Sequence, residues 1–318
     1  MTSSKTILEN LTSITAYLDQ FHPSLRSAYF EKLIAETFSN ILYLPFYTSD
    51  NDDPNIPCRL TWQGNNIKSV SKAPPGKPDA IAYCYSYYLV IEATQKDSVN
   101  QWTQEFAQSI RHCDDFCKQT NIHQKYVFIL LVCTKLFNDT YQSIKNYIRE
   151  EKSKIIPIEV PGLEKILQAS ILAFTLRQLD LCRLFHQIND CISKSSSLTD
   201  FSKLVGSVII KWQKDILKLE RNVFIGVKSY EVMLKIGRSY IGMSEILKEL
   251  NEDPIVNQYL DIIGEKIQCE IIENCLIQQS FASRIAITLD GEKLFEPVPC
   301  VDFKERGLRL IDAVMRIK

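Results

Sequence analysis

The chain has 318 residues, of which 45% are hydrophobic, and its formal net charge is −1 at pH 7. This length allows a sizeable core in one large or two ordinary domains, and the near-zero charge neither requires nor excludes nucleic acid as a partner. No apolar run reaches the roughly 18 residues of a membrane span, and the first residues lack the core of a signal peptide. We therefore expect a soluble, cytoplasmic protein without a membrane partner.

Two amphipathic helices are predicted at the start of the chain, at residues 5–20 and 25–42, where apolar residues recur at helical spacing. Residues 48–57 and 71–78 are rich in Asp, Asn, Pro and Gly and are predicted to form loops. Lys72 and Lys77 belong to the second loop and flank Asp79, so they are candidates to contact phosphates.

The residues after this loop have the pattern of a β-hairpin. Residues 80–84 and 87–93 are rich in Ile, Val and Tyr, and a turn centred between Tyr85 and Ser86 would place Asp79 opposite Glu92. Opposed side chains in an antiparallel pair have Cβ atoms about 4.5–5.5 Å apart. Two carboxylates at this distance repel unless a cation lies between them, and Mg²⁺ prefers such oxygen ligands. The hairpin therefore predicts a metal site.

A helix is predicted to follow, capped by Asp97 and Ser98 and continuing to about residue 118. Its polar residues are spaced by four, three and four positions and so share one face: Gln101, Glu105, Gln108 and His112. Glu105 adds a third carboxylate close to the strand end that carries Glu92. The sequence then predicts a buried strand at 125–133, a helix at 137–151 and a short strand at 155–158.

This set of residues resembles the PD-(D/E)xK nuclease core in the AlwI-like branch of type IIS restriction endonucleases and their nicking relatives. The matching residues are Pro78-Asp79, Glu92-Ala93-Thr94, Gln101, Glu105 and Arg111-His112. The resemblance implies an α/β restriction-endonuclease-like core, a mixed β-sheet flanked by helices, in a nuclease domain of residues 1–170. It also implies that Asp79, Glu92 and Glu105 are catalytic carboxylates that bind Mg²⁺.

Further roles follow from the same resemblance. Gln101 and His112 would position the metal-bound groups or contact phosphates, and Arg111 would clamp a phosphate. For His112, a structural role on a buried helix face remains the alternative. The wider pattern has a lysine where this chain has Thr94, and Lys96 is a candidate for the missing group.

The second N-terminal helix adds another candidate to the site. Nucleases of this fold commonly begin with such a helix, and one of its glutamates often points toward the active site. Glu31 and Glu36 are the two candidates in this chain. For each of them a solvated surface glutamate remains the alternative.

Residues 171–318 are predicted to form a second, mainly helical domain. A serine cluster at 193–197 separates two helical regions, and a hairpin is predicted at Asp290-Gly291. Three short helices precede this hairpin, at 229–237, 244–250 and 255–263. This order is typical of a winged-helix domain that reads DNA grooves. A helical domain without a partner is the alternative.

The sequence predicts a type II, type IIS-like restriction endonuclease that hydrolyses unmethylated double-stranded DNA with Mg²⁺. Cleavage of both strands would need a homodimer, a second nuclease subunit or sequential nicking, and a cognate DNA methyltransferase would be encoded separately. One alternative is a catalytically inactive DNA-binding or structural relative, in which Thr94 has removed the chemistry. Another is a nuclease for branched or repair intermediates. Three closely spaced carboxylates favour an active enzyme.

Overall fold

The structure is a computed structural model of the chain. It describes residues 3–64, 72–74, 76–84, 86–96, 101–151, 154–172, 181–254, 256–257, 260, 266–278 and 281–298. The described residues form two units, one ending at Gln213 and the other beginning at Lys214. The division lies within helix α8 (Leu198–Ile236), later than the expected boundary between residues 170 and 171.

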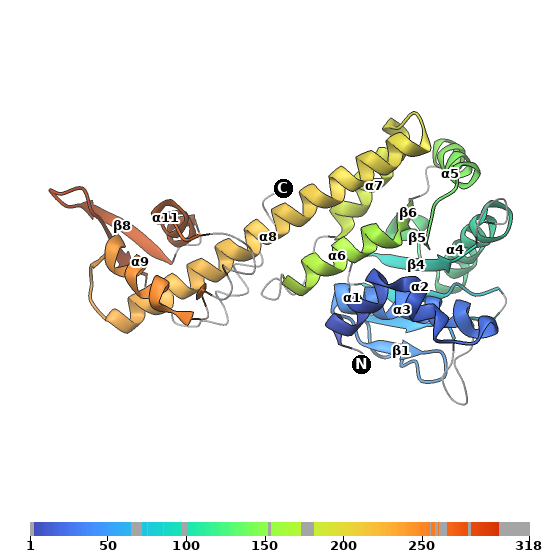
Figure 1. Cartoon of the computed structure of the whole chain (residues 1–318), viewed down its shortest axis with the longest axis horizontal. Coiled ribbons are helices and arrows are strands. Elements are labelled where there is room, and N and C mark those ends of the chain that lie inside the picture. The colour runs from blue at the N-terminus through green and yellow to red at the C-terminus, as the bar shows by residue number, and fades with distance from the viewer. Residues whose placement is uncertain are drawn as a thin grey trace. The chain divides into compact units, whose positions relative to one another are not determined.

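Unit 1 is built around a six-stranded mixed sheet whose strands follow one another in chain order (Figure 1). The strands are β1 (Phe46–Thr48), β2 (Arg59–Trp62), β3 (Ala80–Tyr83), β4 (Tyr88–Thr94), β5 (Val127–Cys133) and β6 (Ile155–Glu159). β3 pairs antiparallel with β2 and β4, whereas β1–β2 and β4–β5–β6 are parallel. The whole of β5 is buried, as a continuous apolar run predicts for a parallel strand.

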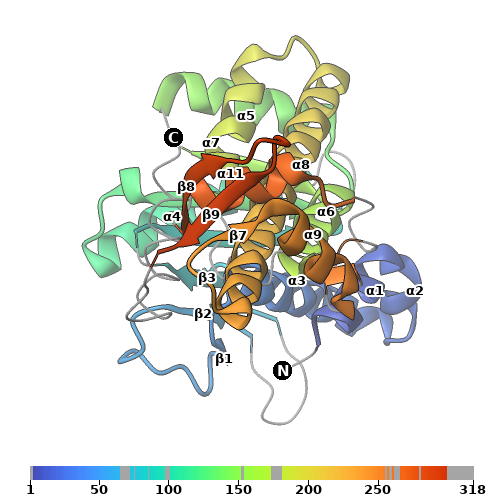
Figure 2. The same cartoon turned by 90° about the vertical axis from the view of Figure 1, so that its left-hand side faces the viewer.

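Helices cover both sides of this sheet. α3 (Arg26–Leu42) packs against β2, β3 and β4, and α1 (Ser4–Thr12) and α6 (Val160–Leu172) pack with it. α4 (Ala107–Thr120) packs against β4 and β5, on the side opposite α3 (Figures 1 and 2). α5 (Asn138–Glu151) and α7 (Leu181–Lys194) complete the unit with the first turns of α8. The predicted mixed sheet flanked by helices is therefore confirmed.

One predicted boundary in unit 1 is wrong. The first helix is interrupted at Ser13, so α1 is followed by a separate α2 (Ile14–Asp19). Pro161 and Gly162 lie in the first turn of α6, where proline is tolerated.

Unit 2 combines the C-terminal part of α8 with α9 (Met243–Glu252), α11 (Cys269–Gln278) and a three-stranded sheet. This sheet consists of β7 (Ile241–Gly242), β8 (Ala282–Ile287) and β9 (Lys293–Pro297), is antiparallel, and has the order β7-β9-β8 (Figure 2). β8 and β9 form the predicted hairpin, and Gly291 in its turn has a φ of 87°, which residues with a Cβ rarely adopt.

The predicted helices of unit 2 match the structure only in part. The separate helix predicted at 229–237 is wrong, because α8 continues through it and tolerates both Gly206 and Gly226. The helix predicted at 244–250 is α9, and most of the segment 255–263 lies outside the described residues. Within the described segments, no helix combines the length and the apolar character that a membrane crossing requires.

An ion pair fixes the loop between β1 and β2. Arg59 Nε donates to Asp52 Oδ1 at 2.8 Å, and Thr61 Oγ1 donates to the same oxygen at 2.7 Å. The guanidinium of Arg59 also lies 4.0 Å from the ring centroid of Tyr83. Although burial opposes ionisation, the hydrogen bonds from Arg59 and Thr61 lower the pKa of Asp52 below its usual value.

Replacing Asp52 with asparagine should lower the free energy of unfolding at pH 7 by about 1–3 kcal/mol, because Arg59 loses its charged acceptor. The lowered pKa means that this contribution is complete above the unfolded pKa of about 3.9 and disappears as the pH falls through the folded pKa. Urea unfolding of wild type and Asp52→Asn at several pH values measures both effects. Asp19→Asn, which removes the exposed ion pair with Arg26, is the control and should cost less than about 1 kcal/mol. Equal losses in both variants would contradict the prediction.

Candidate active site

The β3–β4 hairpin brings two of the predicted carboxylates to one end of the sheet. Ala80 pairs with Ile91 and Tyr83 pairs with Tyr88, which confirms the register that places Asp79 opposite Glu92. The predicted turn residue Tyr85 lies outside the described residues. The backbone N–H of Ala93 donates to Asp79 Oδ2 at 2.7 Å and so fixes this carboxylate beside the end of β4.

His112 reaches the same strand end from α4. Its Nδ1 lies 2.6 Å from Glu92 Oε1, and both side chains are buried. When Glu92 is ionised, the neutral imidazole donates from Nδ1 to the carboxylate, which orients both groups. Burial and the nearby charge of Arg111 lower the pKa of His112 and favour this neutral form. The buried Nε2 has no hydrogen-bond partner among the described residues.

A cavity of about 410 Å³ lies against these groups. It collects four of the five predicted catalytic residues, namely Asp79, Glu92, Glu105 and His112. The cavity is also lined by residues from three other segments. These are Glu31 of α3, Lys72 and Lys77 of the loop before β3, and Lys96 after β4. Residues that are distant in the sequence therefore form one site at the end of the sheet.

The carboxylates of this cavity repel one another. Burial, followed by the charges of Glu92 and Glu31, raises the pKa of Asp79 well above its usual value. Burial and the charges of Glu105 and Glu31 do the same to the pKa of Glu92. A bound cation would relieve this repulsion, because an opposite charge within a few ångströms favours the ionised forms.

Glu31 belongs to the cavity, whereas the other candidate on the same helix, Glu36, is not among the residues that line it. Ser27 Oγ donates to Glu31 Oε1 at 3.0 Å, and burial raises the pKa of Glu31. Glu31 Oε2 is buried without a hydrogen-bond partner among the described residues. The helical pattern of α3 does not decide which of the two glutamates points toward the active site. Only the packing of α3 on the sheet distinguishes them.

Gln101 lies apart from this cavity, although it was predicted to share a face with Glu105 and His112. Residues Gln101–Phe106 form a π-helical turn before α4, and its longer repeat changes the faces that residues four apart occupy. Gln101 is fully buried, and its amide binds three backbone groups. Nε2 donates to Lys135 O at 2.8 Å and to Lys96 O at 3.3 Å, and Oε1 accepts from Phe137 N at 3.1 Å.

The predicted phosphate clamp and the predicted caps of this helix are not among the described residues that line the cavity. Arg111 is exposed and does not line the cavity. Its charge adds to burial in lowering the pKa of His112 and opposes part of the rise in the pKa of Glu92. Asp97 and Ser98, the predicted caps, lie outside the described residues.

The composition of the cavity fits a hard divalent cation. Within the described residues, no three His, Cys, Asp or Glu side chains form a complete metal-binding group. Mg²⁺ is commonly held by only one or two carboxylates, with waters and substrate phosphates as its other ligands. The paired carboxylates Asp79 and Glu92 and the unpartnered oxygen of Glu31 supply donors of this kind.

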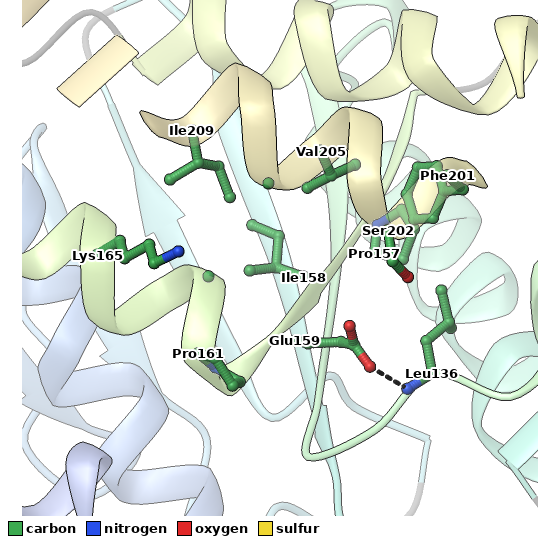
Figure 3. Close-up of a pocket in the computed structure, with 12 residues that line it drawn as sticks. Leu136, Pro157, Ile158, Glu159, Pro161, Lys165, Phe201, Ser202, Val205 and Ile209 are labelled. Carbon is green, nitrogen blue, oxygen red and sulfur yellow. Dashed lines mark hydrogen bonds between the residues drawn. The ribbon is translucent and has the colours of Figure 1, made fainter. Parts of the chain in front are cut away.

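A second cavity of about 160 Å³ lies in the same unit and differs in chemistry. Figure 3 shows that Phe201, Val205 and Ile209 of α8 line it together with Ile158 of β6. Its carboxylate, Glu159, accepts a hydrogen bond from Leu136 N at 3.0 Å and thereby holds the backbone. We therefore assign the candidate active site to the first cavity.

The fold and this carboxylate-lined cavity are those of a restriction-endonuclease-like protein. A family model described as AlwI restriction endonuclease matches residues 8–166, half of the chain. The chain belongs to this family. A solved structure, the small subunit (R.BspD6I2) of the heterodimeric restriction endonuclease R.BspD6I, is similar with a TM-score of 0.46 and 14% identity, over 65% of this chain and 98% of that chain. No curated protein matches the chain.

Replacing Asp79 with asparagine should raise the free energy of unfolding by about 0.5–2 kcal/mol, because it removes a charge repelled by Glu92 and Glu31. Asparagine keeps an oxygen that can accept the hydrogen bond from Ala93 N. Urea unfolding in EDTA measures the change without metal. Asp215→Asn, at an exposed position of α8, is the control and should change stability by less than about 0.5 kcal/mol. A loss of stability in Asp79→Asn would show that repulsion does not dominate this site.

Proposed function

We propose that the protein is a type II, type IIS-like restriction endonuclease, which hydrolyses phosphodiester bonds of unmethylated double-stranded DNA at a specific sequence. The observation that carries this proposal is the convergence of Asp79, Glu92 and Glu105 on one cavity in a chain of the AlwI restriction endonuclease family. Three carboxylates that stay close together at a cost in stability suit a site that binds a cation.

In this proposal Asp79 and Glu92 would hold Mg²⁺, with Glu105 and Glu31 as further donors. When bound there, such an ion would supply a water of lowered pKa and positive charge for the scissile phosphate. His112 orients Glu92 through Nδ1, which fixes the direction of the carboxylate toward the cavity. Lys72 and Lys77 line the same cavity and would contact the DNA backbone.

We also propose that unit 2 is a winged-helix-like domain that reads DNA. Its elements follow the order helix, β7, α9, α11, β8, β9, and β9 lies between β7 and β8. The β8–β9 hairpin corresponds to the wing. Its side chains Ile285, Ile287 and Leu289 are exposed by 43%, 59% and 111%. Apolar side chains of this kind can insert between base steps in a DNA groove.

The described part of the chain contains one such site, and one site cuts one strand at a time. Double-strand cleavage therefore requires a homodimer, a second nuclease subunit or two successive nicks. A cognate DNA methyltransferase, encoded separately, would protect the host DNA. The inactive relative is the second candidate function, and the specific observation in its favour is Thr94 in the place of the usual lysine.

Purified protein should cleave unmethylated phage or plasmid DNA. Discrete fragments or nicked circles should form with Mg²⁺ and be absent in EDTA. Asp79→Asn and Glu105→Gln should each reduce cleavage by at least about 100-fold, because each removes a cavity charge that binds the cation. Asp215→Asn is the control and should cleave like wild type. Intact DNA binding without cleavage by wild type would support the inactive relative.

The double variant Ile287→Ser, Leu289→Ser tests whether the β8–β9 hairpin contacts DNA. This variant should bind a cognate DNA duplex about 10-fold more weakly, or by about 1.4 kcal/mol, because two exposed apolar contacts are lost. Binding is measured by fluorescence anisotropy with Ca²⁺ in place of Mg²⁺. Leu234→Ser, at a residue of α8 that is 52% exposed, is the matched control and should bind normally. Unchanged affinity in the double variant would exclude the hairpin from the DNA interface.

A further inference from the structure

We propose that Lys96 supplies the positive charge that this site presents to the scissile phosphate, and that Thr94 and Gln101 are the positioning residues that hold it there. This inference rests on the proposed nuclease function and adds a residue to its mechanism. It also gives a role to two buried polar side chains, Thr94 and Gln101, that contact the backbone of Lys96.

The ammonium group of Lys96 contacts one carboxylate of the cavity. Its Nζ is 2.6 Å from Glu105 Oε1, and both residues line the cavity that also contains Asp79 and Glu92. The side chain of Lys96 is 44% exposed and that of Glu105 is 16% exposed. Lys96 is therefore anchored at Glu105 and is also accessible from the solvent side, where DNA would approach.

The backbone of Lys96 is held on both sides. Its N–H donates to Thr94 Oγ1 at 3.0 Å, and its carbonyl accepts from Gln101 Nε2 at 3.3 Å. Thr94 is 3% exposed and Gln101 is fully buried, so neither side chain can move without breaking its hydrogen bonds to the backbone. The hydroxyl at position 94 thus turns the chain after β4 so that a lysine two residues later reaches the site.

Gln101 connects this turn to another part of the sheet. The same Nε2 donates to Lys135 O, and Oε1 accepts from Phe137 N, both in the segment that follows β5. The position of Lys96 is therefore tied to the ends of two neighbouring strands. A group that is fixed before the substrate binds costs little reorganisation during the reaction, which is the condition for strong electrostatic stabilisation.

The charges of the cavity explain why such a lysine is needed. Glu31, Asp79, Glu92 and Glu105 would repel an approaching phosphodiester. An ammonium group has three N–H donors, so Lys96 can hold Glu105 and donate to a phosphate oxygen at the same time. Lys96 thereby links the carboxylate cluster to the anion that is to be cleaved.

The test measures single-turnover cleavage with enzyme in excess over unmethylated DNA. Lys96→Met should lower the rate by about 100-fold or more, Lys96→Arg should lower it less, and DNA binding should change by less than about 3-fold because one contact is a small part of the interface. The decisive variant moves the lysine to position 94: Thr94→Lys with Lys96→Met should recover at least about 10-fold over Lys96→Met alone. Lys118→Met, at an exposed position of α4, is the control and should cleave normally.

A second pair of variants tests the positioning role of Thr94. Thr94→Val removes the acceptor for Lys96 N and should lower the rate of cleavage with little effect on DNA binding, whereas Thr94→Ser keeps the hydroxyl and should restore it. Thermal unfolding identifies any variant that loses its fold. Wild-type cleavage together with an unchanged rate in Lys96→Met would overturn the role of Lys96 and leave the nuclease intact. No cleavage by wild type on any unmethylated DNA would overturn the proposed function itself, and the role of Lys96 with it.

Discussion

The antiparallel pairing of β3 with β4 is the constraint on which the site depends. It sets Asp79 opposite Glu92, and a slip of one residue would turn one of the two carboxylates to the other face of the sheet. The backbone around the pair also takes part, because Ala93 N holds Asp79 and the buried His112 holds Glu92. The sheet thus supplies the energy that keeps like charges together, and the parallel strand β5 buries the hairpin from the side.

The features that the sequence predicts well are those that local patterns encode. The apolar run that became β5, the hairpin register and the helices α3 and α5 follow from periodicity and turn position. Asp79 and Glu92 belong to the same category, since each lies at a strand end whose pairing the hairpin pattern fixes. The same reasoning predicted the hairpin at Asp290-Gly291, because a glycine with positive φ is a signal carried by the residue itself.

The features that the sequence does not predict depend on contacts between distant segments. Gln101 has the correct spacing for the catalytic face, but a π-helical turn and three backbone partners draw it away. Glu31 and Glu36 are equivalent in the pattern of α3, and only packing against the sheet brings one of them to the cavity. Likewise, the continuation of α8 through residues 229–236 depends on its packing in the folded unit, because an isolated glycine such as Gly206 or Gly226 marks no certain helix end.

In the proposed mechanism, Lys96 and a divalent cation would have separable tasks in this cavity. Lys96 contacts Glu105 directly, whereas burial and then the charges of Glu92 and Glu31 raise the pKa of Asp79. A monovalent ammonium offsets one carboxylate and leaves the others in repulsion, so a lysine alone does not complete the site. A divalent ion at Asp79 and Glu92 would offset the remainder and, unlike the lysine, would activate a water. Thr94 at the usual lysine position is therefore compatible with an active enzyme, provided that the turn it makes delivers the charge from position 96.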